Sequence, residues 1–297
     1  MKYLKIPLAL FVTAFLMASC GSSTKKEDQS SGTFDLEAYI TAAEAIDPDL
    51  NEVDQVFSIL DMVNAEYYDV LTNDPYNAHS YKTTYPVAAA NLGIYITDIL
   101  YHHYGEENEI LYLTLSAAQE LAKFIGIESE FGAMTFEGLE GTIMRRDTVT
   151  QIFNRLLVDS ENYNSQKELV FIHTALLTGS FVEKVYISSN LLKQKMMIEE
   201  LSKEDISDIK ELLVIYLNQL NPSTAVLYDA YVQQKDQLEG IVILSTFEKL
   251  KELSEELKNV KTSLIAAEVA DIASNESLNA TFELISTLRT TLVAAGS

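Results

Sequence analysis

Apolar residues recur at intervals of three and four along most of this chain, and this spacing restricts what it can fold into. One such face consists of Val53, Val56, Phe57, Leu60, Val63, Tyr67 and Val70. Further faces run through residues 111–125, 206–220, 241–250 and 278–292. This spacing puts apolar side chains on one side of an α-helix, and no convincing run shows the alternation of a strand. The sequence therefore predicts an all-α fold, an antiparallel array of about ten helices.

Helix-breaking residues fall between these apolar runs. Asp47-Pro48-Asp49 and Asn73-Asp74-Pro75 separate the early helices. Gly105 and Gly126 each follow an apolar run, where a left-handed residue often ends a helix. Residues 126–147 hold four glycines among apolar residues, which predicts a long loop or a broken helix. Such a loop is often functional, and a plain connection between helices is the alternative.

The N-terminus has the layout of an export signal. Lys2 and Lys5 precede an apolar run from residue 6 to 17, which is too short to span a bilayer comfortably. The next residues, Ala18-Ser19-Cys20, resemble a lipobox, in which the cysteine thiol receives a diacylglycerol. Cys20 is the only cysteine, so an internal disulfide is excluded. We therefore expect a lipoprotein signal at 1–19 rather than a plain secretory signal, then a flexible tether at 20–33 and a single helical domain at 34–297.

The charge of the chain limits its partners. Lys and Arg number 21 against 44 Asp and Glu, a net charge of −23. Removing residues 1–19 deletes two lysines and no acids, which leaves −25. Such a surface repels nucleic acid and anionic lipid, so we expect no nucleic-acid partner. No later stretch reads as a membrane span, so attachment is expected through lipid on Cys20, at the outer membrane, facing the periplasm or the cell surface.

Known catalytic patterns are missing from the sequence. There is no Gly-x-Ser-x-Gly elbow, no phosphate-binding glycine loop and no thiol beyond Cys20. Asp98 and His102 are four residues apart and could share a metal. The favoured interpretation is that His102 and His103 cap the end of a helix before Gly105. We therefore expect no cofactor and no metal. We expect a binding or structural role in preference to a catalytic one.

Other polar residues leave two interpretations open. Ten of the tyrosines lie between residues 39 and 112, where they could line a ligand groove or belong to the core. Arg145, Arg146 and Arg155 could bind an anionic ligand or pair with nearby carboxylates. His173 lies in an apolar helical run and is expected to be a core histidine, while His79 is expected to be solvated.

Two segments carry a resemblance to a known family. Residues 90–98 are similar to an "NLGxYxxD" pattern, and residues 146–149 with 179–186 resemble "RDS" and "GGWxExxY", although Ser180 and Phe181 depart from the usual Gly and Trp. The family is a group of uncharacterised helical lipoproteins of Bacteroidota. The resemblance implies an all-helical envelope lipoprotein and no known activity. Asp147-Thr148-Val149 also resembles an O-glycosylation motif of that phylum, with Thr148 as acceptor.

The same segments supply the candidate site. Gly93 and Gly179 each cost a helix about 1 kcal/mol relative to alanine, so we expect them where two helices approach closely. An acid and a tyrosine stand three apart in each segment, and we expect each pair to be hydrogen-bonded. The predicted site residues are Tyr95, Asp98, Tyr101, Glu183 and Tyr186. The predicted function is a lipid-anchored binding or structural protein; the alternative is a metal-dependent or carboxylate-based hydrolase around Asp98, His102 and Glu183.

Overall fold

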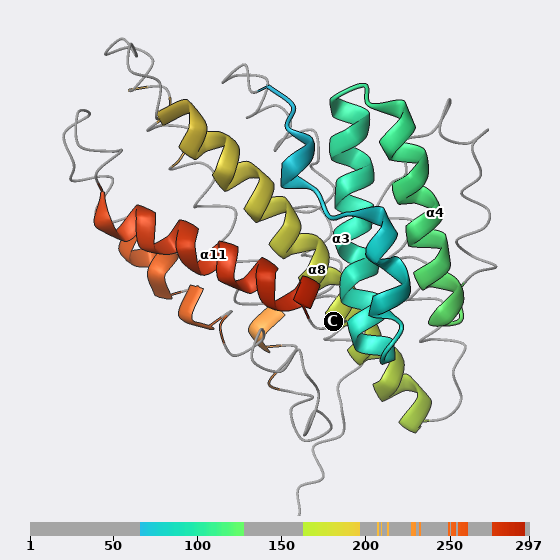
Figure 1. Ribbon diagram of the computed structural model, residues 1–297. Helices are drawn as coiled ribbons and strands as arrows, with labels where there is room; N and C mark the ends of the chain where they lie inside the picture. The colour runs from blue at the N-terminus through green and yellow to red at the C-terminus, as the bar shows by residue number, and fades with distance from the viewer. Residues whose placement is uncertain are drawn as a thin grey trace, which may run out of the picture. The chain divides into compact units, whose positions relative to one another are not determined.

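The computed structural model describes residues 66–127, 163–196 and 275–294, with isolated positions and short runs between 207 and 260. All of them belong to the compact unit Phe34–Ser297. The elements are η1 (Asp69–Leu71), η2 (Pro75–Tyr81), α3 (Tyr85–Tyr104), α4 (Asn108–Phe124), α8 (Tyr163–Met196) and α11 (Glu276–Ala294) (Figure 1). The described part of the chain is helical and contains no strand, which confirms the all-α class.

Several predictions concern residues outside these ranges. They are the export signal and Cys20, the tether, the Asp47-Pro48-Asp49 break, the helix face at residues 53–63, most of the faces at 206–220 and 241–250, the glycines after Gly126, the three clustered arginines and Thr148.

The helix starts follow from local side-chain chemistry. The Thr84 hydroxyl accepts a hydrogen bond from Val87 N at the start of α3, and Pro86 occupies a first-turn position that needs no N–H donor. Asn275 Oδ1 accepts from Leu278 N, 3.0 Å away, at the start of α11. The Asp74 side chain accepts from Tyr76 N ahead of η2, so the predicted break at Asn73-Asp74-Pro75 is confirmed.

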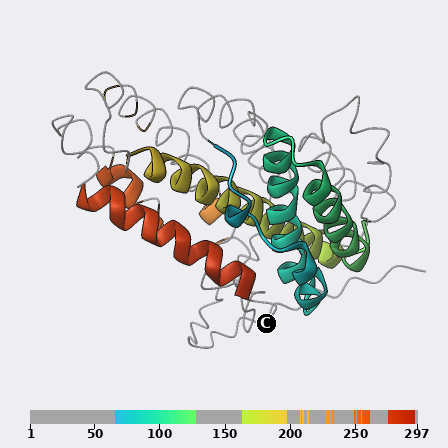
Figure 2. The same ribbon diagram turned by 45° about the horizontal axis from the view of Figure 1, so that its top comes forward.

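Helix α3 is buried on all sides. Every residue from Pro86 to His102 is buried. Contacts come from α4, α8, α11 and η2, and α8 passes beside both α3 and α11 in both ribbon views (Figure 2). Unpaired polar groups on a helix that is buried all round are costly, so the hydrogen-bond partners of its polar side chains help to fix what packs against it.

Two glycines allow α3 and α8 to touch through their backbones. A Cβ on Gly93 would lie 2.1 Å from the Leu176 carbonyl oxygen, and a Cβ on Gly179 would lie 1.8 Å from that of Ala90. No side chain fits at such distances. The prediction of close helix approach at both glycines is confirmed.

The apolar faces predicted for the described helices are confirmed. Leu111, Leu115, Ala118 and Ala122 of α4 are buried. The corresponding residues of α11 are buried as well, namely Leu278, Phe282, Ile285 and Leu292. These faces pack into one hydrophobic cluster with residues of α3 and α8.

The helix predicted through Tyr67 and Val70 does not extend that far. Residues 66–68 are not helical, η1 has three residues, and Val70 is 77% exposed. The backbone here is extended at Tyr68, whose N–H bonds to the Tyr101 side chain instead of to a carbonyl four residues earlier. A tertiary hydrogen bond therefore replaces the helical one.

The two predicted glycine caps differ. Gly126 has φ +85°, as predicted, but Gly105 has φ −77° and the left-handed residue is Glu106, at φ 58°. A glycine is favoured at position 105 for a different reason: a Cβ there would lie 2.4 Å from Cδ2 of Tyr67. The glycine makes room for a tyrosine ring.

The prediction that no later stretch is long and apolar enough to span a membrane is wrong, because part of α8 meets both criteria. Val170–Met196 of α8 has a mean hydropathy of 1.2 in its most apolar window. However, 94% of that window is buried inside the protein, as expected for a core helix.

Candidate functional site

One face of α3 holds the segment that precedes it. We call residues 67–75 the wall segment. Tyr68 N donates to Tyr101 Oη over 2.9 Å, and Asn73 N donates to Asp98 Oδ2 over 3.0 Å. Three of the predicted site residues, Tyr95, Asp98 and Tyr101, therefore lie together, but they bind backbone atoms of the wall segment instead of a ligand.

Two further bonds complete this attachment. Tyr95 Oη donates to the Asp74 carbonyl oxygen over 2.9 Å. Tyr67 Oη and His102 Nδ1 are 2.8 Å apart. The Tyr67 ring also stacks on Tyr101, with ring centroids 4.9 Å apart. Four positions on one face of α3, spaced three, three and one apart, thus fix the course of a segment that has little regular structure of its own.

His102 is a neutral, buried residue. Its side chain is fully buried, and burial lowers its pKa to about 4. The free carbonyls at the end of α3 are satisfied by the backbone, since Gly105 N donates to Tyr101 O and Glu107 N to His102 O. The predicted capping role of His102 is therefore wrong. Its Nε2 atom has no hydrogen-bond partner among the described residues.

Two other histidines, His173 and His79, have the burial that the sequence predicts. His173 is fully buried in α8, and burial lowers its pKa to about 3. His79 has a side chain that is 87% exposed and lies 3.7 Å from Glu120, on η2 and not on a loop.

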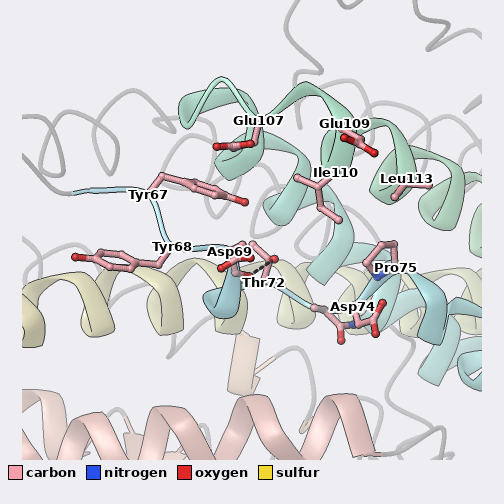
Figure 3. Close-up of a pocket in the computed structure, with 11 residues that line it drawn as sticks. Tyr67, Tyr68, Asp69, Thr72, Asp74, Pro75, Glu107, Glu109, Ile110 and Leu113 are labelled. Carbon is pink, nitrogen blue, oxygen red and sulfur yellow. Dashed lines mark hydrogen bonds between the residues drawn. The ribbon is translucent and has the colours of Figure 1, made fainter.

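The wall segment and the start of α4 enclose a pocket of about 630 Å³. Figure 3 shows the segment on one side and, on the other, Glu107 just before α4 with Glu109, Ile110 and Leu113 of α4. The rings of Tyr67 and Tyr68 point in opposite directions (Figure 3), and the Tyr67 ring lies against Tyr101 and His102 of α3. This volume falls within the range of roughly 300–1,000 Å³ that is usual for small-molecule sites.

The pocket is acidic and partly apolar. Its lining includes the carboxylates Asp69, Asp74, Glu107 and Glu109, and no Lys, Arg or His side chain lines it among the described residues. Pro75, Ile110 and Leu113 supply apolar surface. Four carboxylates around one space attract a positive charge, and a tyrosine ring can contact such a charge through its face.

A second cluster lies where α3, α8 and α11 meet. Arg289 of α11 forms two hydrogen bonds with Glu183 of α8, from Nε to Oε2 at 3.1 Å and from Nη2 to Oε1 at 3.2 Å. Its guanidinium also lies 4.9 Å from the centre of the Tyr186 ring. Although burial alone would lower the pKa of Arg289, the Glu183 carboxylate raises it. Glu183 is fully buried, so this is a desolvated ion pair.

The expected acid–tyrosine pairs are not the bonds that form. Asp98 bonds to Asn73 N and Tyr101 to Tyr68 N, while Glu183 and Tyr186 both engage Arg289. Asp98 and Glu183 nevertheless come together, close enough for a hydrogen bond. The predicted site residues thus form the attachment of the wall segment and the buried charge cluster.

Sequence reasoning missed Arg289 and the pocket itself. Arg289 is 106 residues from Glu183, and its presence in an otherwise apolar helical face was the only available signal. The pocket residues come from the end of a non-helical segment and the first turns of α4, where no periodicity marks them.

The tyrosines divide between the two interpretations. Tyr81, Tyr95 and Tyr101 are core residues, each at most 1% exposed. Tyr67 and Tyr68 line the pocket.

The geometry gives the hydrolase alternative no support. The described residues contain no group of three or more His, Cys, Asp or Glu side chains that could hold a metal ion. Asp98, His102 and Glu183 are each 0% exposed, so they offer no surface to a substrate.

Comparison with models of known protein families, with curated proteins and with solved structures found no match to this chain in any of the three.

Proposed function

We propose that the chain is a lipid-anchored protein of the cell envelope whose helical domain binds a ligand in the pocket between the wall segment and α4. The observation that carries this proposal is the pocket of about 630 Å³, one side of which is fixed by four buried side chains of α3. A rigidly held wall lowers the cost of ordering on binding, which favours affinity. The whole domain is proposed to be the ten-helix antiparallel array that the sequence predicts.

The pocket chemistry supports a ligand with a positive charge beside an apolar or aromatic part. Four carboxylates would attract an amine, and Tyr67, Ile110 and Leu113 would contact its apolar part. A negatively charged sugar or peptide would be repelled, because no described cation lines the pocket. We infer a binding protein for a cationic small molecule or a basic side chain, with no catalytic step.

The lipid anchor is supported by the lipobox-like sequence at Cys20 and by the resemblance to helical lipoproteins of Bacteroidota. Replacing Cys20 with serine is expected to move the folded protein from the membrane fraction to the soluble fraction. The measurement is fractionation of cells that express each form. Retention of the variant in membranes would contradict lipid anchoring while leaving the pocket proposal intact.

Binding is tested with two aromatic probes of similar size and opposite charge, tyramine and 4-hydroxyphenylacetate. Calorimetric titration of the purified protein is expected to detect tyramine alone, with an affinity that falls as salt is added. Replacing Glu107 and Glu109 together with glutamine is expected to weaken tyramine binding about tenfold or more, since two carboxylates leave the pocket.

The matched control is Glu283→Gln together with Glu276→Gln, which removes the same charge from α11. Equal weakening by both pairs would show that only net charge matters, and absence of tyramine binding to the wild type would contradict a cation site here.

A further inference from the structure

The charges where α3, α8 and α11 meet do not balance if both carboxyl groups there are ionised. Asp98 and Glu183 are both 0% exposed, and among the described residues Arg289 is the one cation that acts on both, through hydrogen bonds to Glu183 and through its charge on Asp98. Two carboxylates and one guanidinium would leave a net negative charge in a fully buried place. An uncompensated charge in such a place is strongly unfavourable, and a proton is the usual remedy.

The hydrogen bonds assign that proton to one residue. Both Glu183 oxygens accept from Arg289, which needs the ionised form. Asp98 Oδ2 accepts from Asn73 N, whereas Asp98 Oδ1 has no donor among the described residues. The Asp98 and Glu183 side chains are nevertheless within hydrogen-bonding reach of each other. Two carboxylates cannot hydrogen-bond, but a carboxylic acid can donate to a carboxylate.

We propose that this junction is a proton-binding site, in which Asp98 is a neutral carboxylic acid that donates from Oδ1 to the Glu183 carboxylate. Both oxygens of Asp98 and both oxygens of Glu183 then have a partner of the right kind. Asp98 Oδ2, the carbonyl-type oxygen, accepts from Asn73 N, and Glu183 carries the single negative charge opposite Arg289. The junction is neutral as a whole.

The surroundings of Asp98 agree with this assignment. The charged groups that act on it are Glu183 from α8 and Arg289 from α11. Nearby, the phenols of Tyr67 and Tyr95 have pKa values raised by burial, so they stay neutral. Burial, followed by the Glu183 charge, raises the pKa of Asp98 well above its usual value, against the opposing effects of Arg289 and Asn73 N.

Asn73 connects the proposed proton site to the pocket wall. Asn73 lines the pocket and is 4% exposed, and its backbone N–H bonds to the same carboxyl group that holds the proton. Loss of the proton would place two carboxylates side by side at the base of the wall segment. A change of pH that removes the Asp98 proton is therefore expected to destabilise both the buried junction and the attachment of the wall segment. This inference does not depend on the ligand proposed for the pocket.

The direction of the pH effect follows from linkage. The folded state keeps a proton on Asp98 that the unfolded chain releases near pH 3.9. The contribution of Asp98 to stability is therefore complete below that pH, and it is lost as pH rises toward the raised pKa of the folded state.

The test compares two substitutions in the purified full chain by thermal melting from pH 4 to pH 9. Asp98→Asn keeps the shape of the neutral acid and can donate to Glu183, so at pH 7 it is expected to melt at or above the wild-type temperature. Glu183→Gln leaves Arg289 without its carboxylate and is expected to lower the melting temperature by on the order of 10 °C. The fall of melting temperature with rising pH that Asp98 causes should vanish in Asp98→Asn.

Asp69→Asn and Glu283→Gln, which change exposed acids in the same way, are the controls and should shift melting little. An Asp98→Asn chain that is destabilised as much as Glu183→Gln, or that fails to fold, overturns the proposal. An infrared measurement on the wild type gives an independent reading. A carboxylic-acid carbonyl band is expected at neutral pH, and its absence from the wild type would likewise overturn the assignment.

Discussion

The α3–α8 contact and the wall segment are both held by α3, but in opposite ways. At Gly93 and Gly179 the two helices meet backbone to backbone, with no side chain between them. The wall segment is instead held at a distance by long side chains, Tyr95 and Tyr101 among them, each ending in one hydrogen bond. The first contact tolerates no added atom. The second can lose one bond and keep the others.

The largest expected effect comes from adding one methyl group to the tight contact. Gly179→Ala would place a Cβ 1.8 Å from the Ala90 carbonyl oxygen, so the helices must separate. We expect a loss of at least about 3 kcal/mol in the free energy of unfolding, despite the better helix propensity of alanine. Urea denaturation measures it. A variant as stable as the wild type would show that the helices are not in backbone contact.

Acid is expected to weaken the attachment of the wall segment through His102. Its folded-state pKa is lowered to about 4, so the unfolded chain takes up a proton near pH 6.5 that the folded chain refuses. Stability from this residue is present above pH 6.5 and is lost as pH falls toward 4, by on the order of 3 kcal/mol at 1.36 kcal/mol per pKa unit.

His102→Phe keeps a ring at this position without the titration, and the measurement is the free energy of unfolding between pH 7 and pH 4. The variant should lose less stability over this range than the wild type does. An unchanged pH dependence would assign the acid sensitivity elsewhere, with His173 as the next residue to replace.

Gly105→Ala sharpens the comparison, because it makes the same chemical change as Gly179→Ala beside a side chain. The backbone at Gly105 suits alanine, and the new Cβ would meet the Tyr67 ring. The ring can turn away, at the cost of its stacking on Tyr101, so we expect about 1 kcal/mol of destabilisation. Urea denaturation beside Gly179→Ala measures the difference. Equal losses at the two glycines would contradict the distinction drawn here.

The smallest effect is expected from removing one attachment. Tyr101→Phe leaves Tyr68 N without its acceptor, which should cost about 1 kcal/mol. Amide hydrogen exchange should speed up at Tyr68 while the α3 amides are unchanged. Faster exchange throughout α3 would mean that the hydroxyl stabilises the whole core and not the wall segment.

The sequence predicted those parts of the fold that depend on local pattern. Three features were predictable: the all-α class, the buried faces of α4 and α11, and the close approach at Gly93 and Gly179. Apolar periodicity and a glycine inside a helix can each be recognised within a single segment. The sequence also singled out Tyr95, Asp98 and Glu183. Their partners were not predictable, since the Asp74 carbonyl oxygen and Asn73 N are backbone atoms of a kind that nearly every residue has, and Arg289 lies in a distant helix.

The burial of α3 has a consequence for the order in which the chain can fold. The Asn91 side chain donates to the Leu292 carbonyl oxygen, 201 residues later. Glu183 forms its ion pair with Arg289, 106 residues later. The partners that close around α3 therefore include α11, the last helix along the chain among those that the structure describes. Contacts so distant in sequence slow folding, because a long loop must close before they form. The core around α3 is completed only after α11 has been made.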